Sequence, residues 1–398
     1  MSKDLATSSR ARRRSVLHAS GHRRWPKRVL IGVSILLVLV LIGGVGGWFY
    51  VNSVLSSIKR FQVQTITPET SGAPIDILLV GSDSRAFDTG PGQASAFGSA
   101  ATQTGQRSDV IIVVRLVPGT HQIEMLSIPR DTYVPIPGSG GSNRINAAFN
   151  TGPSLLVQTI RQDFGIPLNH VVVANFQGFE GMVNALGGIS LDFPYPVRDP
   201  DSGLNVTTVG CQSVSGTTAL ALVRSRHLYY FKDGIWNYDG MSDWSRIQRQ
   251  QAFFHALINK VNSEFPNVLA INSFLQATSH DLQVDAGFSA REMISLGLQF
   301  RGVASASLAT EVLPTYGTQI DGNDVLIAAQ PYAQKMISSF LAFGSSARKT
   351  ATRTSGTATT QPATNTSAPS VTTTTTPESQ VVLDNPKDLP EPWNPKPC

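Results

Sequence analysis

The amino-acid sequence predicts an α/β protein, in which a central mixed β-sheet is sandwiched by helices in an α-β-α arrangement. Continuous apolar runs bounded by Gly or Pro recur along the chain, and such runs are typical of strands covered on both faces. Stretches with apolar residues at helical spacing lie between them. Both ends of the 398-residue chain lack the composition of a folded core, so we expect one sizeable domain.

Four strands and four helices are expected after residue 73. The first strand, IDILLV, lies between Pro74 and Gly81. The expected strands are Ile75–Val80, Val110–Leu116, Ile123–Leu126 and His170–Ala174. The expected helices are Ser154–Phe164, Phe176–Leu186, Asp243–Val261 and Ala290–Phe300. Because strands and helices interleave, a sheet with helical layers is the architecture that these elements favour.

Positive charge is concentrated at the N-terminus. Residues 1–28 carry nine Lys and Arg against the single Asp4, a local charge of +8. The formal net charge of the chain is +5, so subtracting +8 leaves −3 for the remainder. Because a nucleic-acid-binding domain needs a broad basic field of its own, this slightly acidic remainder argues against nucleic acid as a partner.

Residues 29–50 form an uncharged apolar run. At ~1.5 Å per residue these 22 residues span roughly 33 Å, enough to cross a bilayer core. A cleaved secretory signal would need a shorter apolar core and a small-residue cleavage site, whereas this run ends in Trp48 and Tyr50, which suit a membrane interface. The excess of basic residues before the run predicts a single-pass cell-membrane protein, with a cytoplasmic N-terminus and everything after about residue 52 outside the cytoplasm.

The resulting organisation has five parts. They are a basic cytoplasmic tail over 1–28, a transmembrane helix over 29–50, a stalk over 51–73, an extracytoplasmic domain over 74–344 and a disordered Thr/Pro-rich tail over 345–398. The Gly/Ser/Ala/Thr-rich stretch 86–106 reads as a long mobile loop between strands. Cys211 and Cys398 are the only cysteines, and the sequence leaves open whether they pair.

Short charged clusters lie at the ends of these elements. Each cluster alone fits a turn, a helix cap or a local ion pair. Arg224 and Arg226 would share one side only if their segment were extended, whereas Arg246 and Gln250 share one face of a helix that Ser242 would cap. Together the clusters supply seven arginines and three aspartates: Arg85, Arg107, Arg130, Arg144, Arg224, Arg226 and Arg246, with Asp83, Asp109 and Asp131.

This combination predicts a pyrophosphate site. The planar guanidinium group presents five donors in a geometry that matches phosphate oxygens. Paired carboxylates suit a hard cation such as Mg²⁺ that bridges phosphate groups.

The chain resembles the LytR-CpsA-Psr family of bacterial cell-envelope proteins over about residues 74–262. The matching stretches, in the family's order, are IDILLVGSDSR, RSDVIIVV, EMLSIPRDTYVPIPG, INAAFNTG, FQGFEGMVNALGGISLDF, ALALVRSRH and SDWSRIQRQQ. The resemblance implies a Mg²⁺-dependent phosphotransferase. Such an enzyme moves a glycopolymer from its polyprenyl pyrophosphate carrier to a muramic acid hydroxyl of peptidoglycan, forming a phosphodiester. Residues 229–240 look like those of actinobacterial members, which suggests arabinogalactan as the glycopolymer.

The resemblance also implies roles for the charged residues. Asp83 and Asp109 would hold Mg²⁺, Asp131 would orient Arg130, and Arg85 and Arg144 would contact the glycan or support the others. The residues that would grip the pyrophosphate are Arg107, Arg130, Arg224, Arg226 and Arg246, with Gln250 alongside. The carrier lipid implies an apolar pocket, for which helices 154–164 and 176–186 are the candidates. Asn184 departs from the family's usual Asp at a place that looks structural.

Two other functions stay open at this point. The domain could bind isoprenoid pyrophosphate without catalysis and regulate other envelope enzymes, or it could be a lipid pyrophosphatase. The general base is not assigned, and Asp109 and Asp243 are both candidates.

Overall fold

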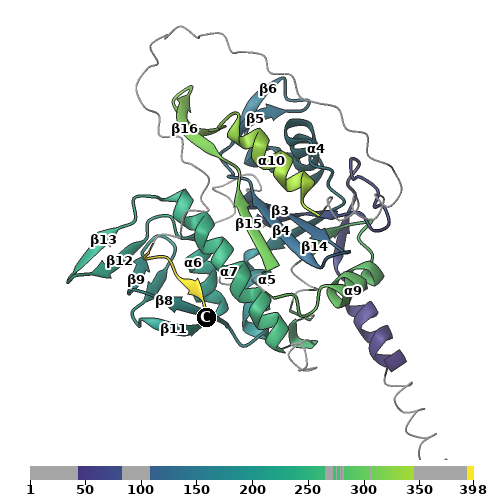
Figure 1. Ribbon diagram of the computed structural model, residues 1–398, viewed down its shortest axis with the longest axis horizontal. Coiled ribbons are helices and arrows are strands. Elements are labelled where there is room, and N and C mark those ends of the chain that lie inside the picture. Colours follow the sequence, from purple (N-terminus) through teal and green to yellow (C-terminus); the bar gives the residue numbers. More distant parts are fainter. Residues whose placement is uncertain are drawn as a thin grey trace, which may run out of the picture. The chain divides into compact units, whose positions relative to one another are not determined.

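The computed structural model describes residues 44–82, 108–264, 272–274, 276–277, 279, 282–304, 307–344 and 392–398, with the side chain of Asp109 excepted. The chain divides into two compact units, Met1–Tyr50 and Val51–Cys398. The fold and the site below belong to the second unit (Figure 1).

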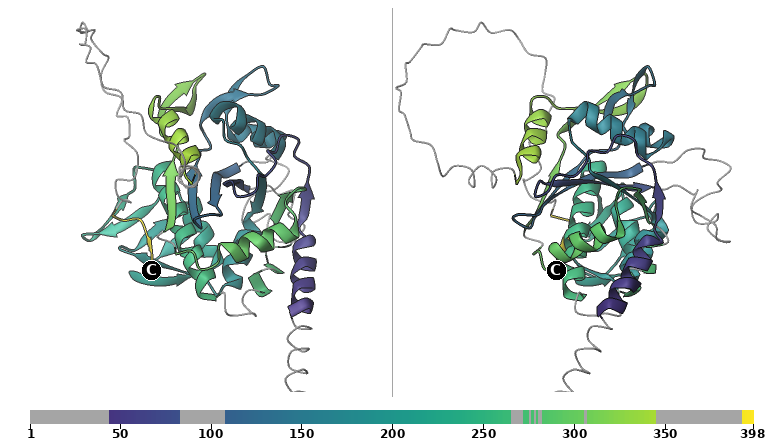
Figure 2. Two further views of the ribbon diagram at one scale, coloured as in Figure 1. Left: turned by 45° about the vertical axis from the view of Figure 1, so that its right-hand side comes forward. Right: turned by 90° about the vertical axis from the view of Figure 1, so that its right-hand side faces the viewer.

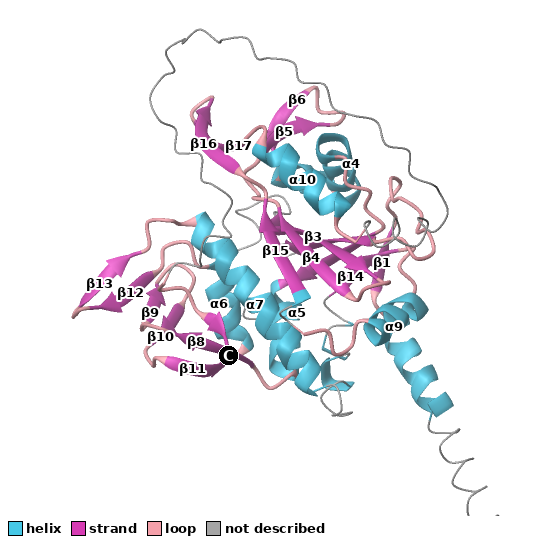
Figure 3. Cartoon of the chain, viewed as in Figure 1, coloured by secondary structure: helices cyan, strands magenta, loops and turns pink. Residues whose placement is uncertain are grey.

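A seven-stranded mixed sheet forms the centre of this unit (Figure 3). The strand order is β1 (Lys59–Phe61), β14 (Leu282–Asp285), β7 (His170–Asn175), β2 (Ile75–Ser82), β3 (Ser108–Val117), β4 (Gln122–Ser127) and β15 (Leu308–Val312). The pairs β1–β14, β7–β2 and β4–β15 are parallel, and the other three are antiparallel. The four strands that the sequence predicts are all in this sheet.

The register brings several strand ends to one end of the sheet. Ser82, the last residue of β2, pairs with Asn175 at the end of β7 and with Ser108 at the start of β3. Ser127, the last residue of β4, pairs with Ile112 of β3 and with Val312 at the end of β15. We call this the carboxyl end of the sheet, after β2, β7, β4 and β15. It is the end at which ligands of open α/β sheets bind.

Helices cover both faces of the sheet (Figure 2). On one face α3 (Asn146–Thr151), α4 (Pro153–Phe164) and α10 (Tyr332–Ala342) bury their apolar residues against β2, β3, β4 and β7. On the other face α7 (Asp243–Glu264) and α9 (Ala290–Gln299) pack on a second apolar cluster of the same strands. The predicted helices over 154–164, 243–261 and 290–300 are thus present, and the mixed α/β fold is confirmed.

A smaller module forms the third apolar core. In it α5 (Phe176–Ala185), α6 (Gly216–Arg224) and part of α7 pack against short strands. These strands form two sheets, one of β11 (Gly210–Val214), β8 (Ile189–Phe193) and β18 (Lys396–Pro397), the other of β10 (Leu204–Val206), β9 (Val197–Asp199), β12 (Tyr229–Lys232) and β13 (Ile235–Tyr238). Because α5 belongs to this core and α4 to the first, the two helices predicted to line a lipid pocket face different cores.

Polar caps explain where α5 and α6 begin. The side chain of Asn175 accepts a hydrogen bond from the amide of Gly178, and that of Ser215 accepts one from the amide of Thr218. Two hairpins complete the unit, β5 (Tyr133–Ile136) with β6 (Gly141–Arg144) and β16 (Thr315–Ile320) with β17 (Asn323–Ala328).

The structure differs from the sequence-based boundaries at both ends of the domain. Segment 51–73, expected as a stalk, supplies β1 to the edge of the sheet. Residues 392–398 were expected within a disordered tail, but Lys396 and Pro397 pair with β8, and a disulfide joins Cys398 to Cys211. Both contacts are made with residues far along the chain, so neither leaves a local apolar pattern.

The predicted membrane span lies mostly outside the described residues, which begin at 44. A helix covers 44–56. In the described part of the chain, no helix combines the length and the apolar character that a membrane crossing requires.

Candidate active site

Asp131 lies between two arginines just beyond the end of β4. Its Oδ2 is 3.5 Å from the Nε of Arg130, and its Oδ1 is 3.7 Å from the Nε of Arg144. The Nε and Nη2 of Arg144 also donate hydrogen bonds to the backbone carbonyl of Asp324, at 3.0 and 2.7 Å. Arg144 is therefore fixed from two sides, and the carboxylate of Asp131 faces both guanidinium groups.

These residues line a polar pocket of about 260 Å³. Its walls also carry the three amide side chains of Asn143, Asn146 and Asn150. Asn143 and Arg144 end the hairpin strand β6, whereas Asn146 and Asn150 belong to α3. Two guanidinium groups and three amides give many donors in a small space, so this pocket is suited to an anion.

Asp243 holds a second pair of arginines at the start of α7. Its Oδ1 is 2.7 Å from the Nε of Arg226, and its Oδ2 accepts a hydrogen bond of 2.8 Å from the Nη2 of the same residue. The Nη1 of Arg246 lies 3.1 Å from Oδ1. The side chain of Arg226 is 38% exposed and that of Arg246 only 6%, so the pair reaches from the interior to the surface.

Arg224 and Gln250 lie beside this pair. The guanidinium group of Arg224 stacks over the ring of Phe176, 4.5 Å from its centroid. The side chain of Gln250 is buried and donates a hydrogen bond of 3.1 Å to the carbonyl of Val223. Arg246 and Gln250, four residues apart, lie on the same face of α7, as predicted. Ser242, predicted to cap this helix, directly precedes it and has a positive φ of 44°.

The i, i+2 spacing of Arg224 and Arg226 suggested an extended segment in which both side chains lie on one side. This prediction is wrong. Arg224 is the last residue of α6, and Ser225 leaves the helix with φ −57° and ψ 124°. The side chains then go separate ways, Arg224 to Phe176 and Arg226 to Asp243. A helix end between the two residues replaces the strand that the i, i+2 spacing suggested.

Both arginine pairs belong to the carboxyl end of the sheet. Arg130 follows the end of β4 by three residues. The side chain of Gln251 in α7 donates a hydrogen bond of 3.5 Å to the carbonyl of Glu311 near the end of β15. Arg246 and Gln250 lie in the neighbouring part of α7, so they too are at the carboxyl end of the sheet. Phe176, under Arg224, directly follows β7.

Asp199 organises the turn that carries Arg226, a role that sequence reasoning missed. Its Oδ2 accepts hydrogen bonds from the Oγ of Ser225 at 2.7 Å and from the amides of Arg226 and His227 at 3.0 Å each. Burial acts to raise the pKa of Asp199, but these hydrogen bonds outweigh it and hold the pKa below its usual value. The turn-rich stretch VRDPDSG, 197–203, is the one local signal of this role.

Arg249 is a second residue whose role the sequence did not reveal. Its side chain is fully buried. It donates hydrogen bonds to Asp239 at 3.1 Å, to the side chain of Asn394 at 2.8 Å and to the carbonyl of Ser225 at 2.8 Å. A buried guanidinium group needs such partners, and here they join α7, the Arg226 turn and the C-terminal segment.

Asn184, the departure from the family pattern, has a structural contact. Its Oδ1 accepts a hydrogen bond of 2.8 Å from the amide of Gly216 at the start of α6. An asparagine oxygen makes this contact without a charge.

Four predicted site residues lie wholly or partly outside the described residues. Asp83, Arg85 and Arg107 are outside, and only the backbone of Asp109 is described. Gly81 of β2 pairs with Val110 of β3, and Ser82 pairs with Ser108. Asp109 therefore has no pairing residue in β2 and forms a β-bulge. Bulges of this kind occur next to active sites, where they redirect a side chain. The magnesium assignment to Asp83 and Asp109, and the loop over 86–106, stay predictions.

The protein is therefore a mixed α/β protein with a cationic site at the carboxyl end of its sheet. In this site two aspartates each pair with two arginines. The model of the LytR_cpsA_psr family matches residues 51–340, and the chain belongs to that family. This match begins before the predicted stalk ends and includes β1.

Relatives carry names from cell-wall assembly. The chain is 30% identical over 288 residues to the probable cell wall biosynthesis protein LcpB of Corynebacterium glutamicum, a match that covers 71% of this chain and 65% of that protein. It is 28% identical over 300 residues to the polyisoprenyl-teichoic acid–peptidoglycan teichoic acid transferase TagU of Enterococcus faecalis, covering 74% and 89% of the two chains.

Among solved structures, the LytR-Csp2A-Psr enzyme from Actinomyces oris superposes with a TM-score of 0.56 at 25% identity, over 71% of this chain and 96% of that one. TagV of Bacillus subtilis superposes with a TM-score of 0.54 at 24% identity, over 69% and 98% of the two chains, and supports the fold alone.

Proposed function

We propose that this protein is a phosphotransferase that moves a glycopolymer from a polyprenyl pyrophosphate carrier to a hydroxyl group of peptidoglycan. The family membership and the names of LcpB and TagU support this class of reaction. The glycopolymer itself is left open by these names, because one relative is named for teichoic acid and the other for the cell wall in general.

One structural observation carries the proposal. Two aspartates, Asp131 and Asp243, each hold two arginines at the carboxyl end of the sheet. Each guanidinium group carries five donors in a planar fork whose geometry matches phosphate oxygens as well as carboxylates. Arginines fixed in this way bind an anion with little further loss of side-chain entropy.

In the proposed reaction the sugar-hydroxyl oxygen attacks the phosphorus next to the glycan. The bond from that phosphorus to the bridging oxygen breaks, polyprenyl phosphate leaves, and the hydroxyl proton passes to a base that is not assigned. Arg130, Arg226 and Arg246 neutralise charge on the transferring and leaving oxygens, while Gln250 donates a hydrogen bond to the carbonyl of Val223 near the end of α6. Arg224 is held against Phe176 and Arg144 against Asp324, where they extend the cationic surface towards the glycan.

We also propose that Asp83 and Asp109 hold Mg²⁺, which when bound would neutralise phosphate charge. Removal of divalent ions with EDTA should then abolish transfer, and added Mg²⁺ should restore it. The variant Asp109→Asn should lose most of this response. Transfer that continues at full rate after chelation and dialysis would contradict the assignment.

For location we propose a single-pass membrane protein whose enzymatic unit lies outside the cytoplasm. The basic residues before the apolar run 29–50 support this orientation. The Cys211–Cys398 disulfide supports it as well, because such bonds persist in oxidising compartments.

The test of the proposed function is transfer of a synthetic polyprenyl-pyrophosphate-linked glycan to purified peptidoglycan by the full-length chain with Mg²⁺. The product to detect is a glycan linked to muramic acid through a phosphodiester. Arg130→Ala should slow transfer about a hundredfold, the usual loss on removing one preorganised donor. Arg161→Ala is the matched control, because Arg161 lies on α4 and contacts the carbonyl of Thr65, away from the carboxyl end.

Two other outcomes would replace the proposal. Binding of the lipid-linked glycan without transfer, with no effect of Arg130→Ala, would favour a regulatory binding protein. Release of glycan phosphate in the absence of peptidoglycan, at the same rate as in its presence, would favour a pyrophosphatase.

A further inference from the structure

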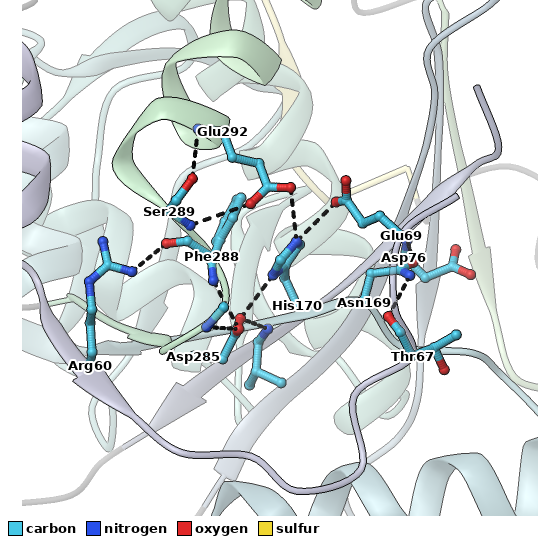
Figure 4. A network of polar contacts seen from close by, with 12 residues as sticks. Arg60, Thr67, Glu69, Asp76, Asn169, His170, Asp285, Phe288, Ser289 and Glu292 are labelled. Atoms are coloured by element: carbon cyan, nitrogen blue, oxygen red, sulfur yellow. Dashed lines mark hydrogen bonds and ion pairs between the residues drawn. The ribbon is translucent and has the colours of Figure 1, made fainter. Parts of the chain in front are cut away.

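Three side chains with metal-ligating atoms meet at the other end of the sheet. Glu69 lies in the segment before β2, His170 begins β7, and Glu292 lies in the first turn of α9 (Figure 4). The Nε2 of His170 is 3.0 Å from the Oε1 of Glu69 and 3.6 Å from the Oε1 of Glu292. One ligand atom from each residue lies within 4.8 Å of the other two.

The far side of the imidazole ring is fixed by Asp285. The Oδ2 of Asp285 lies 3.1 Å from the Nδ1 of His170 and accepts a hydrogen bond of 2.9 Å from the amide of Val171. Its Oδ1 accepts hydrogen bonds from the amides of Gly287 and Phe288, at 2.9 and 3.0 Å. Because both oxygens of Asp285 already accept hydrogen bonds from backbone amides, this carboxylate is an acceptor and the Nδ1 of His170 donates to it.

When the ring of His170 is neutral, this arrangement leaves one acceptor facing two others. With its proton on Nδ1, His170 turns the lone pair of Nε2 towards the carboxylate oxygens of Glu69 and Glu292. The ring cannot turn away easily, because it stacks on Phe288 with 4.2 Å between centroids. Three acceptors in contact require a cation between them, either a proton or a metal ion.

We propose that Glu69, His170 and Glu292 form a binding site for a divalent transition-metal ion of the Zn²⁺ type. One imidazole nitrogen and two carboxylate oxygens are ligands that Zn²⁺ accepts, whereas Mg²⁺ and Ca²⁺ prefer oxygen alone. Ligand atoms at ~2.05 Å from a tetrahedral ion lie about 3.3 Å apart. The distances of 3.0 and 3.6 Å from Nε2 bracket that value.

Two further features fit a metal site. A carboxylate that receives the other ring N–H of the ligating histidine is the usual support of such a ligand, and Asp285 supplies it. Glu69 and Glu292 also line a pocket of about 550 Å³, which gives an ion a path from solvent and room for a fourth ligand.

The site lies away from the arginines. His170 pairs with Ile77 near the start of β2, and Asn175, five residues further along β7, is at the carboxyl end. At ~3.3 Å per residue this separation is about 17 Å. The proposed ion therefore acts as a structural clamp that joins the segment before β2, the sheet and α9, and its binding is separable from transfer.

A second cluster in the described residues serves as an internal control. Asp199, Asp201 and His227 also lie within 4.8 Å of one another. Both oxygens of Asp199 already accept hydrogen bonds from backbone amides, and the side chains of His227 and Asp201 are 53% and 73% exposed. This cluster lacks a supporting carboxylate and a buried histidine, so we expect no metal there.

The experiment is calorimetric titration of ZnCl₂ into the untagged full-length chain, after removal of metals with a chelator and dialysis. One equivalent of Zn²⁺ should bind at micromolar concentrations and raise the Tm, and MgCl₂ at the same concentrations should do neither. Glu292→Gln should weaken Zn²⁺ binding at least tenfold, and it keeps the helix cap with Ser289, because Gln also forms a capping box. His170→Gln should abolish binding. Asp285→Asn should weaken it by 10- to 100-fold.

His227→Gln should bind Zn²⁺ as the unaltered chain does. A chain that takes up no Zn²⁺ would overturn the proposal and leave a proton as the cation of the cluster. Zn²⁺ binding that survives both Glu292→Gln and His170→Gln, or that disappears in His227→Gln, would also overturn it.

Discussion

At the scale of single residues, the aspartates of the site act on arginines. Asp131 faces Arg130 and Arg144, and Asp243 faces Arg226 and Arg246. Each carboxylate limits the rotamers of two long side chains that would otherwise lose up to ~2 kcal/mol of entropy on binding an anion. It also offsets part of the mutual repulsion of the two cations. In the proposed function, an aspartate at such a position contributes to anion binding without contacting the anion.

Asp199 acts one step further away, and its variant Asp199→Asn gives a prediction with a defined pH dependence. An amide offers one oxygen and places donors opposite the amides of Arg226 and His227, so at pH 7 we expect a loss of about 1–3 kcal/mol of unfolding free energy. The folded pKa of Asp199 lies below its ordinary value of 3.8. Its stabilisation is therefore present above about pH 4 and disappears as the pH falls through the folded pKa.

The measurement is urea unfolding of both chains between pH 7 and pH 2.5. Asp201→Asn is the control, because the Asp201 side chain is 73% exposed and its ion pair is with the exposed side chain of His227. A difference between Asp199→Asn and the unaltered chain that stays constant down to the lowest pH would show that the charge of Asp199 is not its cause.

At the scale of elements, the contact between α5 and α6 positions Arg224. Gly216, the first residue of α6, packs so closely on α5 that a Cβ atom there would lie 2.3 Å from the carbonyl oxygen of Glu180. Backbone atoms can yield only if one helix moves. Any such movement displaces the far end of α6, where Arg224 covers Phe176.

We therefore expect Gly216→Ala to lower the free energy of unfolding by about 1–3 kcal/mol, as overpacking does. Gly297→Ala is a matched control with the opposite sign. Gly297 lies inside α9 with nothing within 4 Å of a Cβ atom, so alanine should stabilise the helix by about 0.5–1 kcal/mol. Urea unfolding of the two variants measures both effects, and equal signs would refute this explanation.

The long elements of the fold could be predicted from the sequence, because each one carries its own apolar pattern. β2 and α4, for example, begin and end within two residues of their expected bounds. The strands of the smaller module are two to five residues long, too short to show a period, and none was predicted.

The site was predicted as a set of residue types, whereas its pairings could not be. Arg130 and Asp131 are neighbours in sequence, and their contact follows from that. The pairing of Arg226 with Asp243 depends on where α6 ends. The pairing of Arg249 with Asn394 depends on a segment 145 residues away. No local sequence pattern specifies either pairing.

At the scale of the whole molecule, the C-terminus returns to the smaller module. The ring of Trp393 stacks on Tyr230 with 4.7 Å between centroids, and Asn394 accepts a hydrogen bond from the buried Arg249. The disulfide from Cys398 to Cys211 closes a loop across 187 positions. Because Arg249 also holds the carbonyl of Ser225, this segment contributes to the order of the Arg226 turn.

Cys398→Ser should therefore destabilise the protein by about 2–5 kcal/mol, the usual effect of losing a disulfide. The Tm of the unaltered chain should fall on reduction with dithiothreitol, and the Tm of Cys398→Ser should not change. If both chains respond equally to dithiothreitol, the disulfide is not what secures the C-terminal segment. Transfer activity should fall with the loss of order at Arg226.

The central claim is that the two arginine pairs grip one pyrophosphate group. The most direct measurement is a double-mutant cycle on the transfer rate, with Arg130→Ala, Arg226→Ala and the double variant. Each single change should cost about a hundredfold, and groups that act on one anion should be strongly non-additive, so the double variant should lose far less than about 10⁴-fold. A double variant whose loss equals the product of the two single losses, or a single change without effect, would contradict the claim.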